Sequence, residues 1–117
     1  MHFQILKDNF YNEILEKIEK YFPSFSSVFD KEDGVYPILG ELGTFIMDNF
    51  LNKEIKIQAI NFINESIEIG GAETEDAIVL QLFQKFYEDQ ALSKEVSSLL
   101  APKAFSVFTR YLNRYNE

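Results

Sequence analysis

Apolar residues recur at the spacing of an amphipathic α-helix over about four fifths of this 117-residue chain, and this pattern constrains the fold more than any other feature. A helix with one apolar side must bury that side against another element, so several such helices in a row predict an all-α bundle. The chain has the length of one domain, and no linker or low-complexity tract interrupts it. We therefore expect residues 1–117 to form a single all-α domain, a compact bundle of five to six helices.

Prolines and glycines mark where these helices begin and end. Pro23 disfavours a helical conformation in the residue before it and ends the first helix. Pro37 and Pro102 each suit the first turn of a helix, whereas Gly70 and Gly71 supply a helix stop. Together with the apolar spacing, these signals predict helices over about residues 3–22, 37–52, 53–69, 74–87, 93–100 and 102–116.

Two cap residues and two glycines carry more specific expectations. Thr74 and Ser93 have side chains that cap helix N-termini, so we expect each of them to begin a helix. Gly40 and Gly43 lie inside the second helix, where each glycine costs about 1 kcal/mol relative to alanine. Either their small size permits the close approach of a neighbouring helix, or this helix begins only at about Glu41.

The connections between the helices predict how the helices are arranged. Residues 24–37 are rich in turn formers and form the least regular stretch, with room for one short helical turn. We expect its apolar side chains Phe25, Val28 and Phe29 to hold it against the core.

The remaining connections are short, which favours antiparallel neighbours. Residues 37–69 would then form one helical hairpin and residues 74–116 a second. Two stacked hairpins with the N-terminal helix packed across them are one arrangement, and a less regular compact bundle is the other.

Composition excludes several classes of protein. The chain has no cysteine, which excludes disulfides, thiol catalysis and cysteine metal sites. Its twelve phenylalanines and six tyrosines are expected to fill a helical core. Neither a signal peptide nor an apolar run of about 18 residues is present, so we expect a cytoplasmic protein that does not enter a membrane.

The net charge of −8 disfavours nucleic acid and anionic lipid as partners, because lysine and arginine mainly hold such partners. Residues 65–89 carry seven acids and one base, a net charge of −6, whereas residues 1–64 carry −4 and residues 90–117 carry +2. An acidic surface of this kind is expected to bind a basic protein partner. Solvation and helix-start electrostatics are the alternative explanation. The expected partner-binding residues are Glu65, Glu68, Glu73, Glu75 and Asp76.

Catalytic signatures are weak throughout the sequence. The single histidine, His2, lies near the N-terminus, so triads and metal sites built on histidine are not expected, and neither is a cofactor. Glu41, Thr44 and Asp48 lie on one side of the second helix and form the best candidate ligand-binding set. Seven residues of helix separate the two carboxylates by about 10 Å along the axis, so they can cooperate only through a ligand between them or through another carboxylate.

Parts of the sequence resemble a family of small bacterial helical proteins of uncharacterised role. The resemblance lies in Gly40-Glu41-Leu42-Gly43, in Phe62-Ile63-Asn64, in the Gly70-Gly71 break and in the apolar residues from Leu80 to Phe86, and it spans about residues 35–115. Such proteins are similar in size, in acidity and in their lack of catalytic residues to immunity proteins that neutralise bacterial toxins. The resemblance implies a binding role.

Three hypotheses follow for the function of the chain. The first is a protein-interaction domain, in particular an immunity protein that binds a basic toxin through its acidic surface. The second is a homodimeric structural or adaptor protein whose exposed aromatic patch contains Tyr87, Tyr111 and Tyr115. The third is a small-ligand-binding protein or enzyme in which Glu41 and Asp48 line one cavity.

Overall fold

The computed structural model describes residues 8–117, and every regular element in this range is helical. The α-helices are α1 (Asn9–Tyr21), α2 (Val35–Asp48), α3 (Lys53–Ile69), α4 (Ala72–Ile78), α5 (Gln84–Tyr87), α6 (Gln90–Leu99) and α7 (Pro102–Tyr115), and one short 3₁₀ turn covers Lys31–Asp33. Within the described residues, no helix is both long and apolar enough to cross a lipid bilayer.

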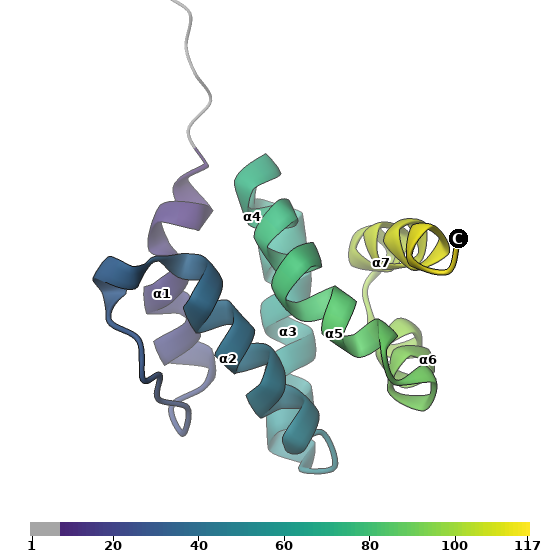
Figure 1. Ribbon diagram of the computed structural model, residues 1–117, viewed down its shortest axis with the longest axis horizontal. Coiled ribbons are helices and arrows are strands. Elements are labelled where there is room, and N and C mark those ends of the chain that lie inside the picture. Colours follow the sequence, from purple (N-terminus) through teal and green to yellow (C-terminus); the bar gives the residue numbers. More distant parts are fainter. Residues whose placement is uncertain (1–7) are drawn as a thin grey trace, which may run out of the picture.

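Helices α4 and α5 are parts of one continuous helix, which we call the central helix (Figure 1). A π-helical turn, Val79–Phe83, joins them, and the flanking residues Ile78 and Gln84 keep ordinary right-handed helical dihedral angles. When the central helix is counted as one, the described residues contain six helices, which confirms the predicted all-α bundle.

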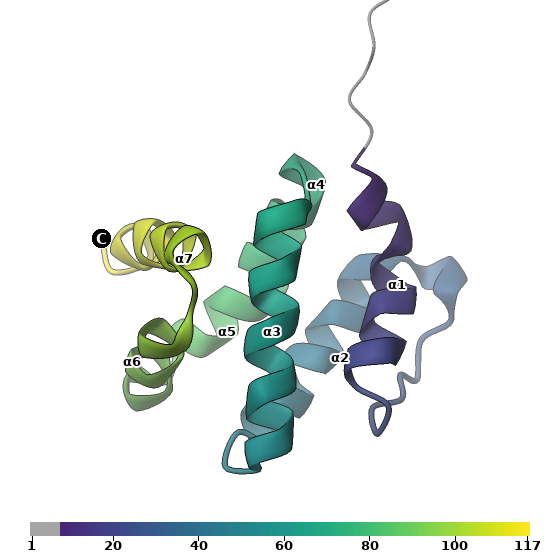
Figure 2. The same ribbon diagram turned by 180° about the vertical axis from the view of Figure 1, so that it is seen from behind.

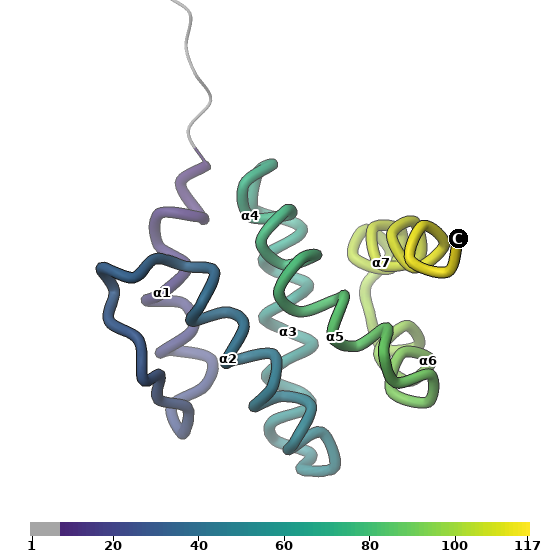
Figure 3. Tube along the Cα trace, in the orientation of Figure 1, coloured from purple at the N-terminus to yellow at the C-terminus, as the bar shows by residue number. Residues whose placement is uncertain are grey.

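The central helix and α2 form the front of the molecule in Figure 1, and α1 and α3 lie behind them. Figure 2 shows α3 from the other side, flanked by α1 and by the pair α6 and α7. Helix α3 packs against α1, α4 and α7, whereas α2 packs mainly on the π-helical turn and less on α3. The first expected hairpin does not form one layer, because α2 lies with the central helix at the front and α3 lies behind them with α1 (Figure 1); the chain path can be followed in Figure 3.

Phenylalanine rings fill the centre of the bundle, as the composition predicts. Phe22 of the segment after α1 meets Phe62 of α3 edge to face, with ring centroids 5.6 Å apart. Phe83 of the π-helical turn meets Phe108 of α7 at 4.9 Å, also edge to face. All four rings are fully buried, and aromatic pairs in this geometry contribute about 0.5–1.5 kcal/mol each beyond the burial of their area.

The two glycines of α2 permit a close helix contact, which decides between the two alternatives that the sequence left open. Helix α2 begins at Val35 and runs through both glycines, so a start at about Glu41 is wrong. A Cβ atom at Gly43 would lie 2.8 Å from the backbone oxygen of Gln81 in the π-helical turn, and one at Gly40 would lie 2.9 Å from the Gln81 side chain. A glycine is therefore needed at position 43, where a Cβ atom would meet backbone, whereas at position 40 only the end of a flexible side chain would have to move.

Two predicted helix starts are wrong. Helix α4 begins at Ala72, so Thr74 lies inside its first turn and is buried. Helix α6 begins at Gln90, and Asp89 caps it by accepting a hydrogen bond from the backbone N–H of Leu92. Ser93 lies one turn further along and is buried.

The ends of the first two helices also differ from the sequence prediction. Helix α1 begins at Asn9, and the predicted start at residue 3 falls outside the described residues. Helix α2 begins at Val35 and ends at Asp48, four residues before the predicted end at Asn52. Asn52 instead caps α3, because its side chain accepts hydrogen bonds from the backbone N–H groups of Glu54 and Ile55.

Candidate functional site

The fully exposed positions of the central helix include acids and no base; its one base, Lys85, is half-buried and donates a hydrogen bond to the Thr44 hydroxyl of α2. The exposed side chains of the central helix recur at steps of three and four residues, which places them along one side of a helix. We call them the acidic row: Glu73, Asp76, Leu80, Gln84 and Glu88, the last of which directly follows α5. Two of the predicted partner-binding residues, Glu73 and Asp76, belong to this row and are exposed.

Leu80 gives the acidic row an apolar centre. The apolar residues from Ile78 to Tyr87 nearly encircle the helix, which predicts burial for all of them, but Leu80 is 46% exposed. It lies in the π-helical turn, and its neighbours Val79 and Leu82 are buried. π-Helical turns are frequent at functional sites, so the combination of this turn with an exposed leucine distinguishes the row from an ordinary solvated helix face.

Glu65 is half-buried and is held by contacts to α1. The Tyr21 hydroxyl donates a hydrogen bond of 2.7 Å to Glu65 Oε2, and Lys17 Nζ lies 3.1 Å from Glu65 Oε1. The hydrogen bond from Tyr21 lowers the pKa of Glu65; burial opposes this effect, and Lys17 reinforces it. Burial together with the same hydrogen bond raises the pKa of Tyr21 to about 12. Glu65 therefore joins α3 to α1, and its charge is already compensated.

Glu75 is also engaged within the chain. Its Oε2 atom lies 3.4 Å from Nη2 of Arg110 on α7, and both side chains are partly exposed. An exposed ion pair of this kind contributes about 0–1 kcal/mol to stability. Its main consequence here is geometric, because it places the basic side of α7 next to α4.

Glu68 is exposed on α3, near the C-terminus of that helix. The last turn of α3 contains no basic residue, so Glu68 stands at the negative end of the helix dipole without local compensation. The sequence thus groups five acids that the structure separates. Glu73 and Asp76 share the acidic row, and Glu68 lies on another helix. Glu65 and Glu75 each form an ion pair with a base of the same chain.

Glu41, Thr44 and Asp48 do line one groove, as the ligand-binding hypothesis requires. The groove is open, has a volume of about 440 Å³, and its other lining residues are Ser24, Phe25, Ser26, Val28 and Phe45. The Glu41 carboxylate accepts hydrogen bonds from the backbone N–H of Val28, with N···O distances of 3.2 and 3.3 Å. Glu41 therefore fixes the preceding connection in place, and Asp48 is left exposed at the end of α2.

The connection before α2 is held by fewer side chains than the sequence predicts. Phe25 contacts Phe45 of α2, with ring centroids 5.3 Å apart, which agrees with the prediction. Val28 and Phe29 are 88% and 41% exposed, so the prediction that they also pack on the core is wrong. The hydrogen bonds from the backbone N–H of Val28 to the Glu41 carboxylate hold this connection against α2 instead.

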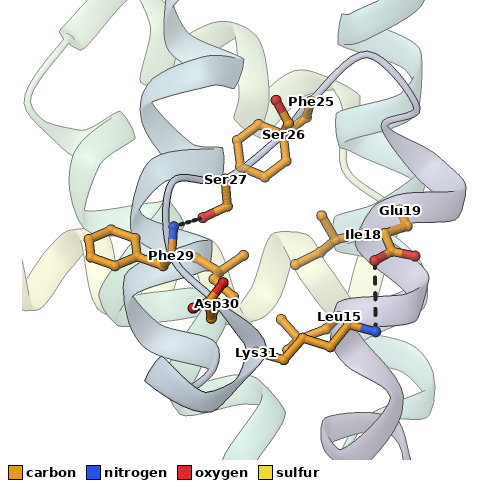
Figure 4. A pocket seen from close by; sticks show the side chains of 10 residues that line it. Leu15, Ile18, Glu19, Phe25, Ser26, Ser27, Phe29, Asp30 and Lys31 are labelled. Carbon is orange, nitrogen blue, oxygen red and sulfur yellow. Dashed lines mark hydrogen bonds and ion pairs between the residues drawn. The ribbon is translucent and has the colours of Figure 1, made fainter.

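A second pocket, of about 320 Å³, lies between α1 and this connection (Figure 4). Leu15 and Ile18 form its apolar part on α1, and Lys31 Nζ lies 3.9 Å from Glu19 Oε1 at its mouth. These two charged groups are opposed and exposed, so they do not converge on the interior. Within the described residues, no group of three or more histidine, aspartate or glutamate side chains is placed to hold a metal ion. His2 lies outside the described residues.

The predicted aromatic patch for a homodimer is wrong in one residue. Tyr87 is only 7% exposed, and its hydroxyl donates a hydrogen bond of 2.7 Å to the backbone oxygen of Phe108. Burial raises the pKa of Tyr87 accordingly. Tyr111 is half-buried, and Tyr115 is exposed but lies against Tyr87 in a tilted arrangement, with ring centroids 5.4 Å apart. These rings belong to the core and its border.

Sequence reasoning missed the basic side of α7. Lys103, Arg110 and Arg114 are exposed and separated by seven and four residues, the spacing of one helix side. The guanidinium carbons of Arg110 and Arg114 lie 5.1 and 5.3 Å from the ring centroid of Tyr111. The net charge of +2 in residues 90–117 is the signal in the sequence that points to this side.

The comparisons with known proteins add no relative to this picture. No protein-family model and no curated protein matches the sequence, and no solved structure matches the fold.

Proposed function

We propose that this chain is a protein-interaction domain of the cytoplasm that binds a basic protein partner through the acidic row. The observation that carries the proposal is the row itself: three carboxylates, one leucine and one glutamine are exposed along the central helix, and no base is exposed among them. Binding rather than catalysis is the proposed activity.

The charge of the row favours encounter with a basic partner. Glu73, Asp76 and Glu88 form no ion pair among the described residues, so their carboxylates are available to a partner. Electrostatic attraction of this kind raises the association rate at low salt and is screened beyond about 10 Å at 0.1 M salt. Leu80 adds apolar contact at the centre of the row, where interface residues contribute most to affinity.

The biological role that fits such binding best is toxin immunity. An immunity protein needs only a stable scaffold and a charged face, because it acts by occupying its toxin. The size and acidity of the chain support this role, because small bacterial helical proteins that the sequence resembles share these properties with immunity proteins.

Affinity capture from a lysate of the producing cells at low salt, followed by mass spectrometry, tests the proposal. We expect one specific basic protein, whose binding weakens with salt and is lost in the double variant Glu73→Lys/Asp76→Lys. For toxin immunity, that protein arrests growth when it is produced alone and not when both proteins are produced together.

The double variant Glu13→Lys/Glu16→Lys is a matched control. It changes the net charge by the same amount, with the same three-residue spacing, on exposed positions of α1. It should bind as the native protein does. Equal loss of binding in both variants would mean that total charge, and not the acidic row, determines association.

A further inference from the structure

The exposed side of α7 is the electrostatic counterpart of the acidic row. Residues 102–115 contain three bases and no acid. Lys103, Arg110 and Arg114 lie along one exposed side of α7, and we call them the basic row. One chain therefore presents two helix sides of opposite charge.

The two rows are neighbours on the surface. The ion pair between Glu75 of α4 and Arg110 of α7 joins the two helices, and α7 also packs against the π-helical turn and α5. Figure 1 shows α7 beside the central helix. The two rows therefore lie on neighbouring helices that cross each other: Figure 1 shows α7 nearly end-on and the central helix along its length.

From this layout we infer that a second copy of the chain binds here, with the basic row of each protomer on the acidic row of the other. A two-fold axis that bisects the angle between two neighbouring strips of opposite charge places each strip of one protomer on the opposite strip of the other. This follows because residue i contacts residue j and residue j contacts residue i in such a dimer. Leu80, exposed within the acidic row, would contribute apolar contact. The self-association is independent of any partner, but it covers the face that the proposed function uses, so a basic partner would have to displace the second copy.

The dimer should be weak and sensitive to salt. Its contacts are exposed charge pairs, which contribute little individually and are screened at high ionic strength. Sedimentation equilibrium of the purified protein alone, over a wide concentration range, measures this. We expect dimers at low salt and monomers in about 1 M salt, where the Debye length is about 3 Å.

A charge swap tests the pairing of the two rows. Glu73→Lys/Asp76→Lys and Lys103→Glu/Arg114→Glu should each weaken self-association about tenfold or more, because each places like charges opposite each other. Arg110 is left unchanged because it pairs with Glu75 within the chain. An equimolar mixture of the two variants should form a dimer again, since every contact in the mixed dimer joins opposite charges. Glu13→Lys/Glu16→Lys should dimerise as the native protein does.

Several outcomes would overturn the inference. One is a native protein that stays monomeric at high concentration and low salt, and this measurement needs no variant to fold. A mixture that remains monomeric although both variants keep the native circular dichroism would exclude the pairing of the rows. Species larger than dimers would exclude the two-fold arrangement. None of these results bears on capture of a basic partner, so the proposed function is tested separately.

Discussion

The carboxylate of Asp8 accepts hydrogen bonds from both the backbone N–H and the hydroxyl of Thr74, 66 residues further along the chain, each at 2.8 Å. The same carboxylate accepts a hydrogen bond of 3.0 Å from the backbone N–H of Tyr11 in the first turn of α1. One side chain thus caps two helices whose N-termini meet. Gly71 lets this happen, since a Cβ atom there would lie 3.2 Å from the Asp8 carboxylate.

Replacing Asp8 by alanine should therefore cost more than the loss of an ordinary cap. Loss of one cap costs about 0.5–2 kcal/mol, and here the N–H groups of two helices and a buried hydroxyl lose their acceptor. We expect Asp8→Ala to lower the free energy of unfolding by about 2–3 kcal/mol in urea titrations. Asp89→Ala removes a cap from α6 alone and should cost about 1 kcal/mol. Equal costs for the two variants would contradict the double role of Asp8.

The stability contributed by Asp8 should disappear in acid. Burial acts to raise the pKa of this carboxyl, but the hydrogen bonds from Thr74 and Tyr11 outweigh burial and hold the pKa below its usual value. A lowered folded-state pKa gives stability that is present above the unfolded-state pKa of about 3.9 and is lost as the pH falls through the folded-state pKa. Urea unfolding between neutral pH and about pH 3 should show a shallower loss in Asp8→Asn than in the native protein.

The two glycines of α2 should respond in opposite directions to alanine. At Gly40 the new methyl group meets only the end of the flexible Gln81 side chain, so Gly40→Ala should be neutral or stabilise by up to about 1 kcal/mol through helix propensity. At Gly43 it meets the backbone oxygen of Gln81, which cannot move without shifting the central helix. Gly43→Ala should destabilise by about 1–3 kcal/mol in thermal or urea unfolding. Stabilisation by both variants would contradict the close crossing.

Local signals were enough to predict the helices but not what caps them. The apolar stripe and the Gly70-Gly71 stop predict α3 at Lys53–Ile69, the bounds that the structure has. The capping role assigned to Thr74 is wrong because its partner is distant in sequence, and no local pattern encodes such a contact. The π-helical turn could not be predicted from the sequence either, because the apolar residues of Val79–Phe83 are equally typical of a buried α-helix.

The candidate site was predicted in part, because composition reveals acids but not their neighbours. The sequence identifies Glu73 and Asp76, which are exposed. It also groups Glu65 with them, although Lys17 and Tyr21 of α1 compensate that charge through contacts that only the fold creates. Leu80 is missed because helical spacing alone predicts burial.

Removing the Tyr21 hydroxyl should weaken the contact between α1 and α3. Tyr21→Phe takes a donor from the Glu65 carboxylate and should cost about 1–2 kcal/mol of unfolding free energy. Tyr36→Phe is the control, because no hydrogen bond of the Tyr36 hydroxyl is present within the described residues. Equal stability of the two variants would contradict the role of this hydrogen bond.

The same contact predicts a loss of stability in alkali. The pKa of Tyr21 rises from 10.0 to about 12 in the folded protein, so its contribution is complete below about pH 10 and is lost as the pH rises towards 12. The ultraviolet absorbance of tyrosinate should show one late-titrating tyrosine fewer in Tyr21→Phe than in the native protein, while Tyr87, whose pKa burial also raises, titrates late in both. An unchanged titration curve in the variant would contradict the raised pKa.

Two variants of helix α3 test whether the charge of Glu68 lowers the stability of the protein. Glu54 lies in the first turn of α3 and Glu68 near its end, and both side chains are exposed. The helix dipole favours a negative charge at the first position and disfavours it at the second, by about 0.3–1 kcal/mol in each case. Glu68→Lys should therefore stabilise the protein and Glu54→Lys should destabilise it, although both change the net charge equally. Thermal unfolding at low salt measures the difference, which should shrink in about 1 M salt. If both variants change stability in the same direction, net charge and not the helix dipole determines the effect of a charge at these positions. Glu68 would then not be a residue that lowers the stability of the fold.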